Sequence, residues 1–207
     1  MPPLLLAGLV SVAAAATPAP VPGDCAGADP AQPSRCIYRS AFPSTGLVAH
    51  CQSDRDCRVG YYYGDPGTPT WLDPPPGLTT LPKPEVIWHA ATFAEVRFDC
   101  GAPCRVSYFF EAKRRRVSPP RAQVLDVDIR RLLVAQADAR TLVVRQIFSG
   151  REVARLDRDW SPGSSLEASL TAIHFDPDGR LTFTWLKGQD RAPVTERVSV
   201  PSIPRRP

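Results

Sequence analysis

The sequence lacks the short motifs that mark several common enzyme classes. It contains no Gly-x-Ser-x-Gly segment, no phosphate-binding glycine loop and no pair of histidines in HxH or HxxxH spacing. These absences argue against an α/β-type serine hydrolase, a P-loop protein and a paired-histidine metal site. We therefore predict no catalytic residue, no metal and no cofactor, and a protein that is not an enzyme. Should it be one after all, the cluster to test is His174, Asp176 and Asp178.

Long apolar runs are absent beyond the first residues. Residues 4–16, LLLAGLVSVAAAA, have the length of a signal-peptide core and are too short to span a bilayer. Ala14 and Ala16 match the small-x-small cleavage pattern, so residues 1–16 are predicted to be a signal peptide removed after Ala16. The rival interpretation is a buried core helix. We expect a periplasmic or secreted protein with no transmembrane segment.

The composition does not favour helices, because 24 of the 207 residues are proline. Proline costs about 3 kcal/mol inside a helix, so an all-β or loop-rich chain is favoured. The prolines concentrate in a predicted flexible arm (17–34), a connector (65–84) and a tail (201–207). Residues 35–200 are predicted to form a single β domain around that connector.

Six cysteines accompany the predicted export signal, and an even number in an oxidising compartment indicates three disulfides. Paired zinc ligands are usually separated by two residues, whereas two of these intervals are five and three residues long. Local pairing is favoured, which gives Cys25–Cys36, Cys51–Cys57 and Cys100–Cys104.

One hairpin pattern occurs three times along the chain. Cys51–Tyr63 and Cys100–Phe110 share the order Cys-loop-Cys-Arg-Val-small-Tyr-aromatic-aromatic, and Ile173–Trp185 repeats it without cysteines around the turn Asp-Pro-Asp-Gly. The aromatic triplets, Tyr61–Tyr63 and Tyr108–Phe110, place aromatic rings on both faces of their strands. Either other layers cover both faces of these strands, or one face is an exposed aromatic patch that binds a protein or glycan partner.

Residues 123–156 also divide into short apolar segments separated by turns, with strands expected at 123–128, 132–136, 142–148 and 152–156. The rival interpretation is an amphipathic helix over 124–137. With the hairpins, the strands predict an all-β fold, an antiparallel meander of repeated, disulfide-stapled hairpins that is sandwich-like or resembles an incomplete propeller.

Two turns are candidate binding elements. The first is the run of four cations Lys113, Arg114, Arg115 and Arg116, and the second is Ser149, Gly150 and Arg151. Such a basic run could bind an acidic protein or an anionic envelope surface. Nucleic acid is not expected, because the predicted compartment is exported and the net charge is only +4.

The segments Arg97–Phe110 and Phe175–Trp185 resemble hairpins of small exported proteobacterial β-proteins, namely periplasmic lysozyme inhibitors and immunity proteins. The resemblance covers about half the chain and implies a binding protein that inhibits a cell-wall hydrolase. Such inhibitors carry a Ser-Gly-x-x-Tyr loop, which matches Ser149 and Gly150 here, with Val153 at the tyrosine position. The expected function is therefore an inhibitor or immunity-type partner of an envelope-acting hydrolase, with a structural or assembly component of the envelope as the alternative.

Overall fold

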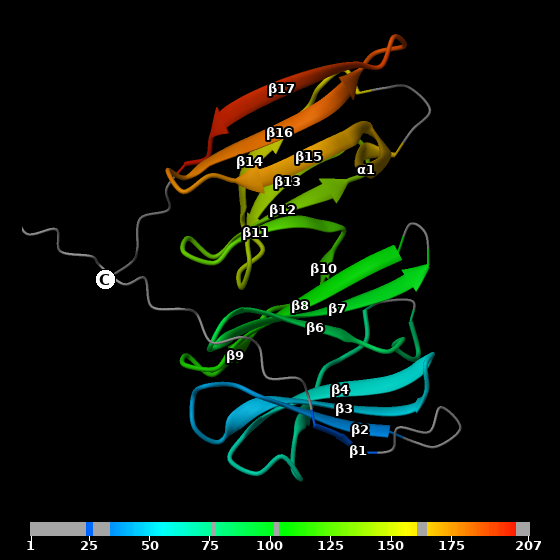
Figure 1. The fold of residues 1–207 in the computed structure, drawn as a ribbon, viewed down its shortest axis with the longest axis vertical. Coiled ribbons are helices and arrows are strands. Elements are labelled where there is room, and N and C mark those ends of the chain that lie inside the picture. The colour runs from blue at the N-terminus through cyan, green and yellow to red at the C-terminus, as the bar shows by residue number, and fades with distance from the viewer. Residues whose placement is uncertain (1–23, 27–33, 76–77, 102–103, 161–164, 202–207) are drawn as a thin grey trace, which may run out of the picture.

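The computed structural model describes residues 24–26, 34–75, 78–101, 104–160 and 165–201 (Figure 1). The predicted signal peptide, most of the predicted arm and residues 202–207 lie outside these ranges. The described chain is all-β, as predicted, and every strand pairing is antiparallel. The single short helix of this part, α1 (Leu166–Ser169), is capped by the Ser165 side chain. No helix within the described ranges has the length and apolar character needed to cross a membrane.

The strands form four sheets, here named A to D, which follow one another along the chain. Sheet A contains β1 (Asp24–Ala26), β2 (Ser34–Arg39), β3 (Thr45–Ser53), β4 (Asp56–Tyr63) and β5 (Thr70–Trp71). Sheet B contains β6 (Glu85–Ala90), β7 (Phe93–Gly101), β8 (Cys104–Glu111), β9 (Arg116–Val117) and β10 (Arg121–Ala122). Sheet C contains β11 (Val124–Asp128), β12 (Leu133–Asp138), β13 (Thr141–Gln146) and β14 (Glu152–Leu156). Sheet D contains β15 (Leu170–Phe175), β16 (Arg180–Lys187) and β17 (Ala192–Ser199).

The four sheets stack face to face in chain order along the long axis of the molecule (Figure 1). Three buried clusters join neighbouring sheets. The A–B cluster includes Leu47, Val59, Val96, Phe98 and Phe110. The B–C cluster consists of Phe93, Phe109, Val124, Val134 and Ile147. The C–D cluster includes Leu133, Leu142, Leu181, Phe183 and Trp185. Sheets B and C are therefore covered on both faces.

Covering both faces of sheet B accounts for the second aromatic triplet. Tyr108 and Phe110 point into the A–B cluster, whereas Phe109 points the opposite way into the B–C cluster and is completely buried. On β4, the middle residue Tyr62 is also buried, on the outer face of sheet A, where it packs over Gly46. Coverage of both faces by other sheets is therefore correct for Tyr108–Phe110. For Tyr61–Tyr63 both interpretations stay open, because Tyr62 lies on the face of sheet A that none of the other three described sheets covers.

The three copies of the repeated pattern are the hairpins β3–β4, β7–β8 and β15–β16. The residue after the shared arginine, Val59, Val106 or Leu181, is buried in an inter-sheet cluster in each copy. In the third copy, Gly179 adopts a φ of 88° and donates its N–H to the Asp176 carbonyl. Glycine adopts this conformation without steric cost, so the turn closes without a disulfide.

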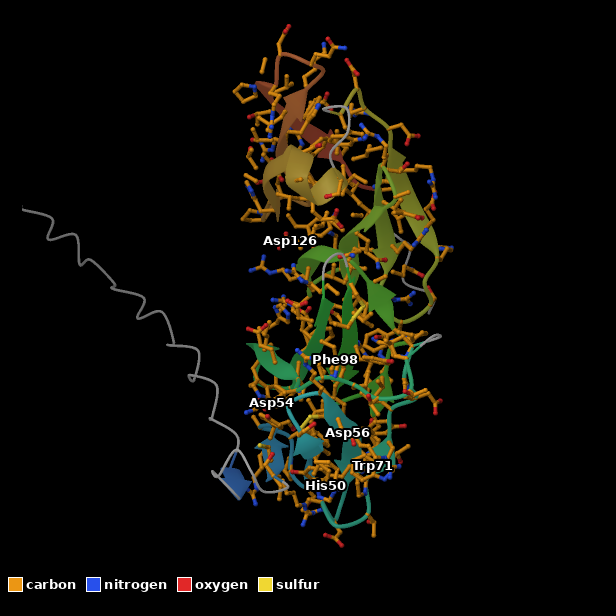
Figure 2. The ribbon with its side chains drawn as sticks, turned by 90° about the vertical axis from the view of Figure 1, so that its right-hand side faces the viewer. His50, Asp54, Asp56, Trp71, Phe98 and Asp126 are labelled. Carbon is orange, nitrogen blue, oxygen red and sulfur yellow. A yellow bond between two sulfur atoms is a disulfide. The ribbon has the colours of Figure 1, made fainter. Side chains whose placement is uncertain are left out.

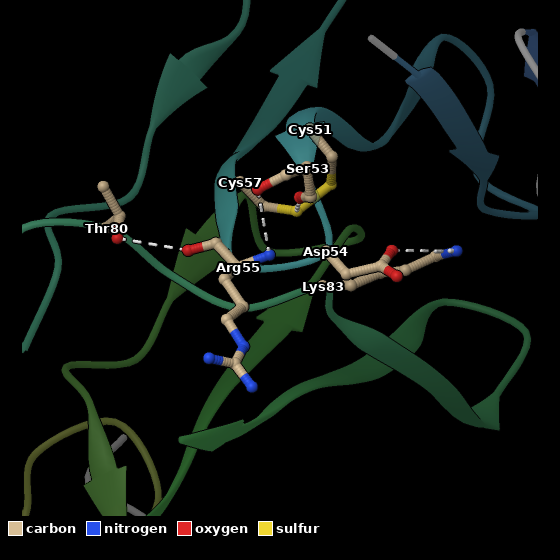
Figure 3. Close-up of a disulfide and its surroundings, with 7 residues drawn as sticks. All are labelled: Cys51, Ser53, Asp54, Arg55, Cys57, Thr80 and Lys83. Atoms are coloured by element: carbon tan, nitrogen blue, oxygen red, sulfur yellow. Dashed lines mark hydrogen bonds and ion pairs between the residues drawn. A yellow bond between two sulfur atoms is a disulfide. The ribbon is translucent and has the colours of Figure 1, made fainter. Parts of the chain in front are cut away.

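The disulfides Cys51–Cys57 and Cys100–Cys104 form as predicted. Figure 3 shows the first of them at the base of the β3–β4 turn. Cys36 is also disulfide-bonded, and the β1–β2 register places Cys25 directly opposite it. The side chain of Cys25 lies outside the described part of the structure, so the predicted Cys25–Cys36 bond stays a prediction.

The proline-rich connector 65–84 is fastened to sheet A rather than running free. It contributes the short strand β5, and the Leu81 carbonyl accepts a 2.7 Å hydrogen bond from the Cys57 N–H. Two further contacts tie it to the β3–β4 turn (Figure 3): the Thr80 hydroxyl donates to the Arg55 carbonyl, and Lys83 lies 3.9 Å from the Asp54 carboxylate.

Residues 124–137 form strands, not the alternative helix. The chain reverses between β11 and β12, where Asp128 accepts hydrogen bonds from the backbone N–H groups of Arg130 and Arg131. Leu132 then adopts a φ of 59°, which a right-handed helix does not allow. The apolar spacing that suggested a helix therefore arises from two strands joined by a short turn.

A buried carboxylate lies on the face of sheet B that meets sheet C. Glu95 is fully buried on β7. Its carboxylate accepts hydrogen bonds from Ser107 (2.6 Å) and Arg97 (3.1 Å) and lies 3.0 Å from His89 Nε2. Burial alone would raise the pKa of Glu95, but the hydrogen bonds from His89, Ser107 and Arg97 outweigh it and lower the pKa below its ordinary value.

Replacement of Glu95 by Gln should reduce the free energy of unfolding at pH 7 by about 2–3 kcal/mol, because Arg97 and Ser107 lose a buried charged acceptor. A carboxyl with a depressed folded-state pKa stabilises the fold above its unfolded pKa, and this contribution is lost as pH falls through the folded pKa. Urea unfolding between pH 7 and pH 3 should therefore show the gap between wild type and E95Q narrowing below about pH 4.5. A gap that stays constant with pH would contradict this assignment.

Candidate binding surface

The two turns that the sequence singles out lie next to each other. The first, residues 112–115, joins β8 to β9, and the second, residues 147–151, joins β13 to β14. The Arg116 guanidinium lies over the Phe148 ring, 3.7 Å from its centroid. Phe148 in turn makes an edge contact with the ring of Phe93 in the B–C cluster. A cation–π contact therefore brings together two turns from different sheets.

Glu111 neutralises part of the first turn. Its carboxylate pairs with Arg114 at 2.7 Å and with Arg116 at 2.6 Å. Within the described ranges, no carboxylate forms an ion pair with Lys113, Arg115 or Arg151, and all three side chains are exposed. The two turns together therefore present positive charge that the fold itself does not compensate.

The first turn is also attached to sheet A. The Arg115 guanidinium lies 5.6 Å from the centre of the Tyr63 ring, and Tyr63 stacks on Phe110. Burial and the neighbouring Tyr61 raise the pKa of Tyr63 to about 12, although Arg115 opposes this shift. The turn therefore lies against an uncharged aromatic surface.

Arg121 supports the second turn from behind and was not predicted from the sequence. Its Nε and Nη2 atoms donate to the Ile147 carbonyl at 2.9 and 2.5 Å. Burial and the neighbouring Arg145 lower its pKa. The contact joins residues that are 26 positions apart, so no local sequence pattern predicts it. We define the basic surface as Lys113, Arg114, Arg115, Arg116, Arg121 and Arg151.

Ser149 holds its own turn and is not placed as a nucleophile. Its hydroxyl is bonded to the Gln146 side chain and accepts a hydrogen bond from the Arg151 N–H. A serine nucleophile needs a neighbouring base to take its proton. In this geometry the hydroxyl shapes the turn that presents Arg151.

The cluster His174, Asp176 and Asp178 does come together, at the β15–β16 turn. Asp176 lies 3.1 Å from His174 Nε2 and accepts a 2.7 Å hydrogen bond from the Thr182 hydroxyl. Thr182 and Arg197 lower the pKa of Asp176. Because the hydroxyl donates to the carboxylate rather than to the imidazole, His174 is not positioned to activate it.

Comparison with known proteins leaves the resemblance to periplasmic inhibitors as an expectation. No protein-family model matches the chain, and no curated protein matches it. The tyrosine position of the inhibitor loop, Val153, is half-buried and packs against the C–D cluster. The exposed part of the corresponding turn is therefore Ser149, Arg151 and Glu152.

Gly150→Ala should destabilise the second turn. Gly150 has a φ of 72°, and a Cβ atom there would lie 2.7 Å from Arg121 Nη1. Gly188→Ala is the matched control, because Gly188 has a similar positive φ of 56° and its Cβ would lie 3.5 Å from the nearest atom, Asp159 Oδ2. Urea unfolding should show G188A costing about 1 kcal/mol and G150A about 1 kcal/mol more, because Arg121 must also shift. Equal losses would mean that Arg121 does not constrain the turn.

Proposed function

We propose that the protein is an exported binding protein whose basic surface docks on an acidic region of an envelope-acting hydrolase and inhibits it, either as an inhibitor or as an immunity partner. The observation that carries the proposal is the Arg116–Phe148 contact, which makes one surface from two separately predicted turns. The disulfides fit an extracellular or periplasmic location.

The residue types on this surface support a protein partner. Arginine and aromatic side chains are enriched among residues that dominate binding energy, and Phe148 and Tyr63 lie under Arg116 and Arg115. Glu111, Arg121 and the ring contacts hold the backbone of the turns, so little backbone entropy is lost on binding.

Charge indicates which hydrolases the surface can approach. The chain carries a net charge of +4, and Lys113, Arg115 and Arg151 have no carboxylate partner in the described part of the chain. Opposite charges across an interface speed association and fix orientation, whereas like charges oppose it. The expected partner is therefore an enzyme with an acidic cleft rather than a basic lysozyme.

The test compares wild type with the triple variant K113E/R115E/R151E. The control is R55E/R130E/R191E, which changes the net charge equally at three exposed arginines outside the basic surface. Crosslinking in periplasmic extract, followed by a peptidoglycan hydrolysis assay with the captured enzyme, should show capture and inhibition by wild type and control. The first triple should lose at least tenfold in inhibitory potency.

Two outcomes would overturn the proposal. One is that wild type captures no hydrolase, or captures one whose activity it leaves unchanged. The other is that the two triple variants inhibit equally well. Binding of wild type to anionic vesicles without any hydrolase partner would instead assign the basic surface to the envelope and reject the inhibitor function.

A further inference from the structure

A row of nitrogen-bearing side chains crosses the outer face of sheet A, away from the basic surface. The register places Arg35 opposite His50 and His50 opposite Arg58, on β2, β3 and β4. The neighbouring residues Cys36 and Val59 point into the A–B cluster, so the row points outward. Figure 2 shows His50 at the end of the molecule formed by sheet A.

The Arg35–His50–Arg58 row has no ion-pair partner among the described residues. Like charges directly opposite each other on neighbouring strands destabilise a sheet. Burial and the two arginines lower the pKa of His50. An anion placed over the row would offset the repulsion between the two arginines and a protonated His50.

In the other two copies of the hairpin, the arginine equivalent to Arg58 has a carboxylate opposite it or close to it. Arg105 is the counterpart of Arg58 in the second copy, and there the opposite residue is the carboxylate Asp99. The counterpart in the third copy is Arg180, which lies 3.7 Å from Asp178. In sheet A, a histidine backed by a second arginine replaces the carboxylate.

The side chains of the row are held in place before any ligand arrives. The Arg58 guanidinium lies 4.6 Å from the centre of the Trp71 ring, and the His50 ring lies 5.6 Å from it. Trp71 is fixed on β5 beside Gly60, where a Cβ atom would lie 3.0 Å from the indole. The Cys51–Cys57 disulfide, one register position away, holds His50 opposite Arg58.

Arg35 is anchored differently and retains unused hydrogen-bonding capacity. Its Nη2 donates to the Pro66 carbonyl at 2.8 Å, while its buried Nε has no hydrogen-bond partner. A buried donor without a partner costs free energy. The connector loop therefore fixes the guanidinium but does not satisfy it.

A hollow of about 350 Å³ adjoins the row; it is lined by Arg58 of the row and by Trp71, which packs against Arg58 and His50. The Thr79 and Thr80 residues line it, as do the acidic residues Asp56 and Asp73. Threonine hydroxyls and carboxylates can bind the hydroxyl groups of a ligand, whereas the two carboxylates would repel a second negative charge. The lining suits a molecule that is anionic at one end and hydroxylated at the other.

We propose that the Arg35–His50–Arg58 row binds the phosphate group of a sugar phosphate whose hydroxylated ring enters the adjoining hollow. Guanidinium groups bind phosphate with strong charge-assisted hydrogen bonds, and a protonated His50 adds another donor between them. This site goes beyond the hydrolase-binding function and uses none of the residues of the basic surface.

The site makes binding depend on pH. The charged groups that act on His50 are Arg35 on β2 and Arg58 on β4. Asp56 precedes Arg58 by two residues on β4, and Asp65 is adjacent in sequence to Pro66, whose carbonyl binds Arg35. A bound phosphate favours the protonated imidazole, so it should raise the pKa of His50, and affinity should increase as pH falls through that pKa. His89 and His174 serve as internal references.

The experiment is a calorimetric and NMR titration of the oxidised full chain with glucose 6-phosphate, inorganic phosphate and glucose. Glucose 6-phosphate should bind at least tenfold more tightly than inorganic phosphate, and glucose should not bind measurably. Saturation should raise the pKa of His50, whereas the imidazole resonances of His89 and His174, which lie in sheets B and D, should not shift on addition of the ligand.

Two variants and a matched control make the result specific. Arg58→Gln should weaken glucose 6-phosphate binding at least tenfold, whereas Arg105→Gln, at the equivalent position of the second hairpin, should change it less than twofold. His50→Gln should remove the gain in affinity that protonation of the imidazole provides, and leave only the pH dependence from the second ionisation of the phosphate, whose pKa is about 6. Urea unfolding of each variant checks that the fold is retained.

The proposal is overturned if glucose 6-phosphate leaves the pKa of His50 unchanged, or if R58Q and R105Q weaken binding equally. Equal affinity for inorganic phosphate and glucose 6-phosphate would reject the sugar phosphate and leave a bare anion site.

Discussion

Sheets B and C, the inner two of the stack, bury apolar side chains on both faces. Each of them therefore needs a neighbouring sheet on either side. Phe109 on one face of β8 and Phe110 on the other are both almost completely buried, and they pack against different sheets. Burial of large apolar side chains is the main favourable contribution to folding. Sheets A and D are therefore needed as outer layers, and each has one face left for other interactions.

Coverage on both faces also restricts what polar groups the inner sheets can contain. Glu95 is tolerated between sheets B and C because Ser107, Arg97 and His89 surround its carboxylate. The carboxylate of Asp126 on β11 is also hydrogen-bonded. It accepts a 2.6 Å hydrogen bond from the Phe175 N–H, and this bond links sheet C to sheet D. Burial raises the pKa of Asp126, and its hydrogen bonds to the backbone oppose the shift.

Local patterns in the sequence were sufficient to predict the hairpins, since alternation, turn residues and cysteine spacing all act over about ten residues. Gly179 and the Cys51–Cys57 pair occupy the turns where those patterns placed them. The order of the stack could not be predicted in this way, because the contact between Phe109 and sheet C depends on packing between segments far apart in the chain.

For the candidate binding surface, too, the separate turns were predictable from local patterns, but the contact between them was not. Lys113–Arg116 and the Ser149–Arg151 turn were identified singly from composition and turn chemistry. Their union depends on the Arg116–Phe148 contact, and its support depends on Arg121 reaching the Ile147 carbonyl. Glu95 left no such signal, because a charged residue between Ala94 and Val96 is the ordinary alternation of a half-exposed strand, and its burial depends on the cover that sheet C supplies.

Repetition of one hairpin explains how new surface chemistry arises here without a new fold. Val59 and Val106 fill equivalent core positions, so the arginine before each is directed outward by the same strand geometry. What lies opposite that arginine is unconstrained by the core. Asp99 lies opposite Arg105 in the register, whereas His50 lies opposite Arg58, whose guanidinium packs on Trp71. In the proposed site, a change at this one cross-strand position replaces a carboxylate by a histidine opposite the arginine.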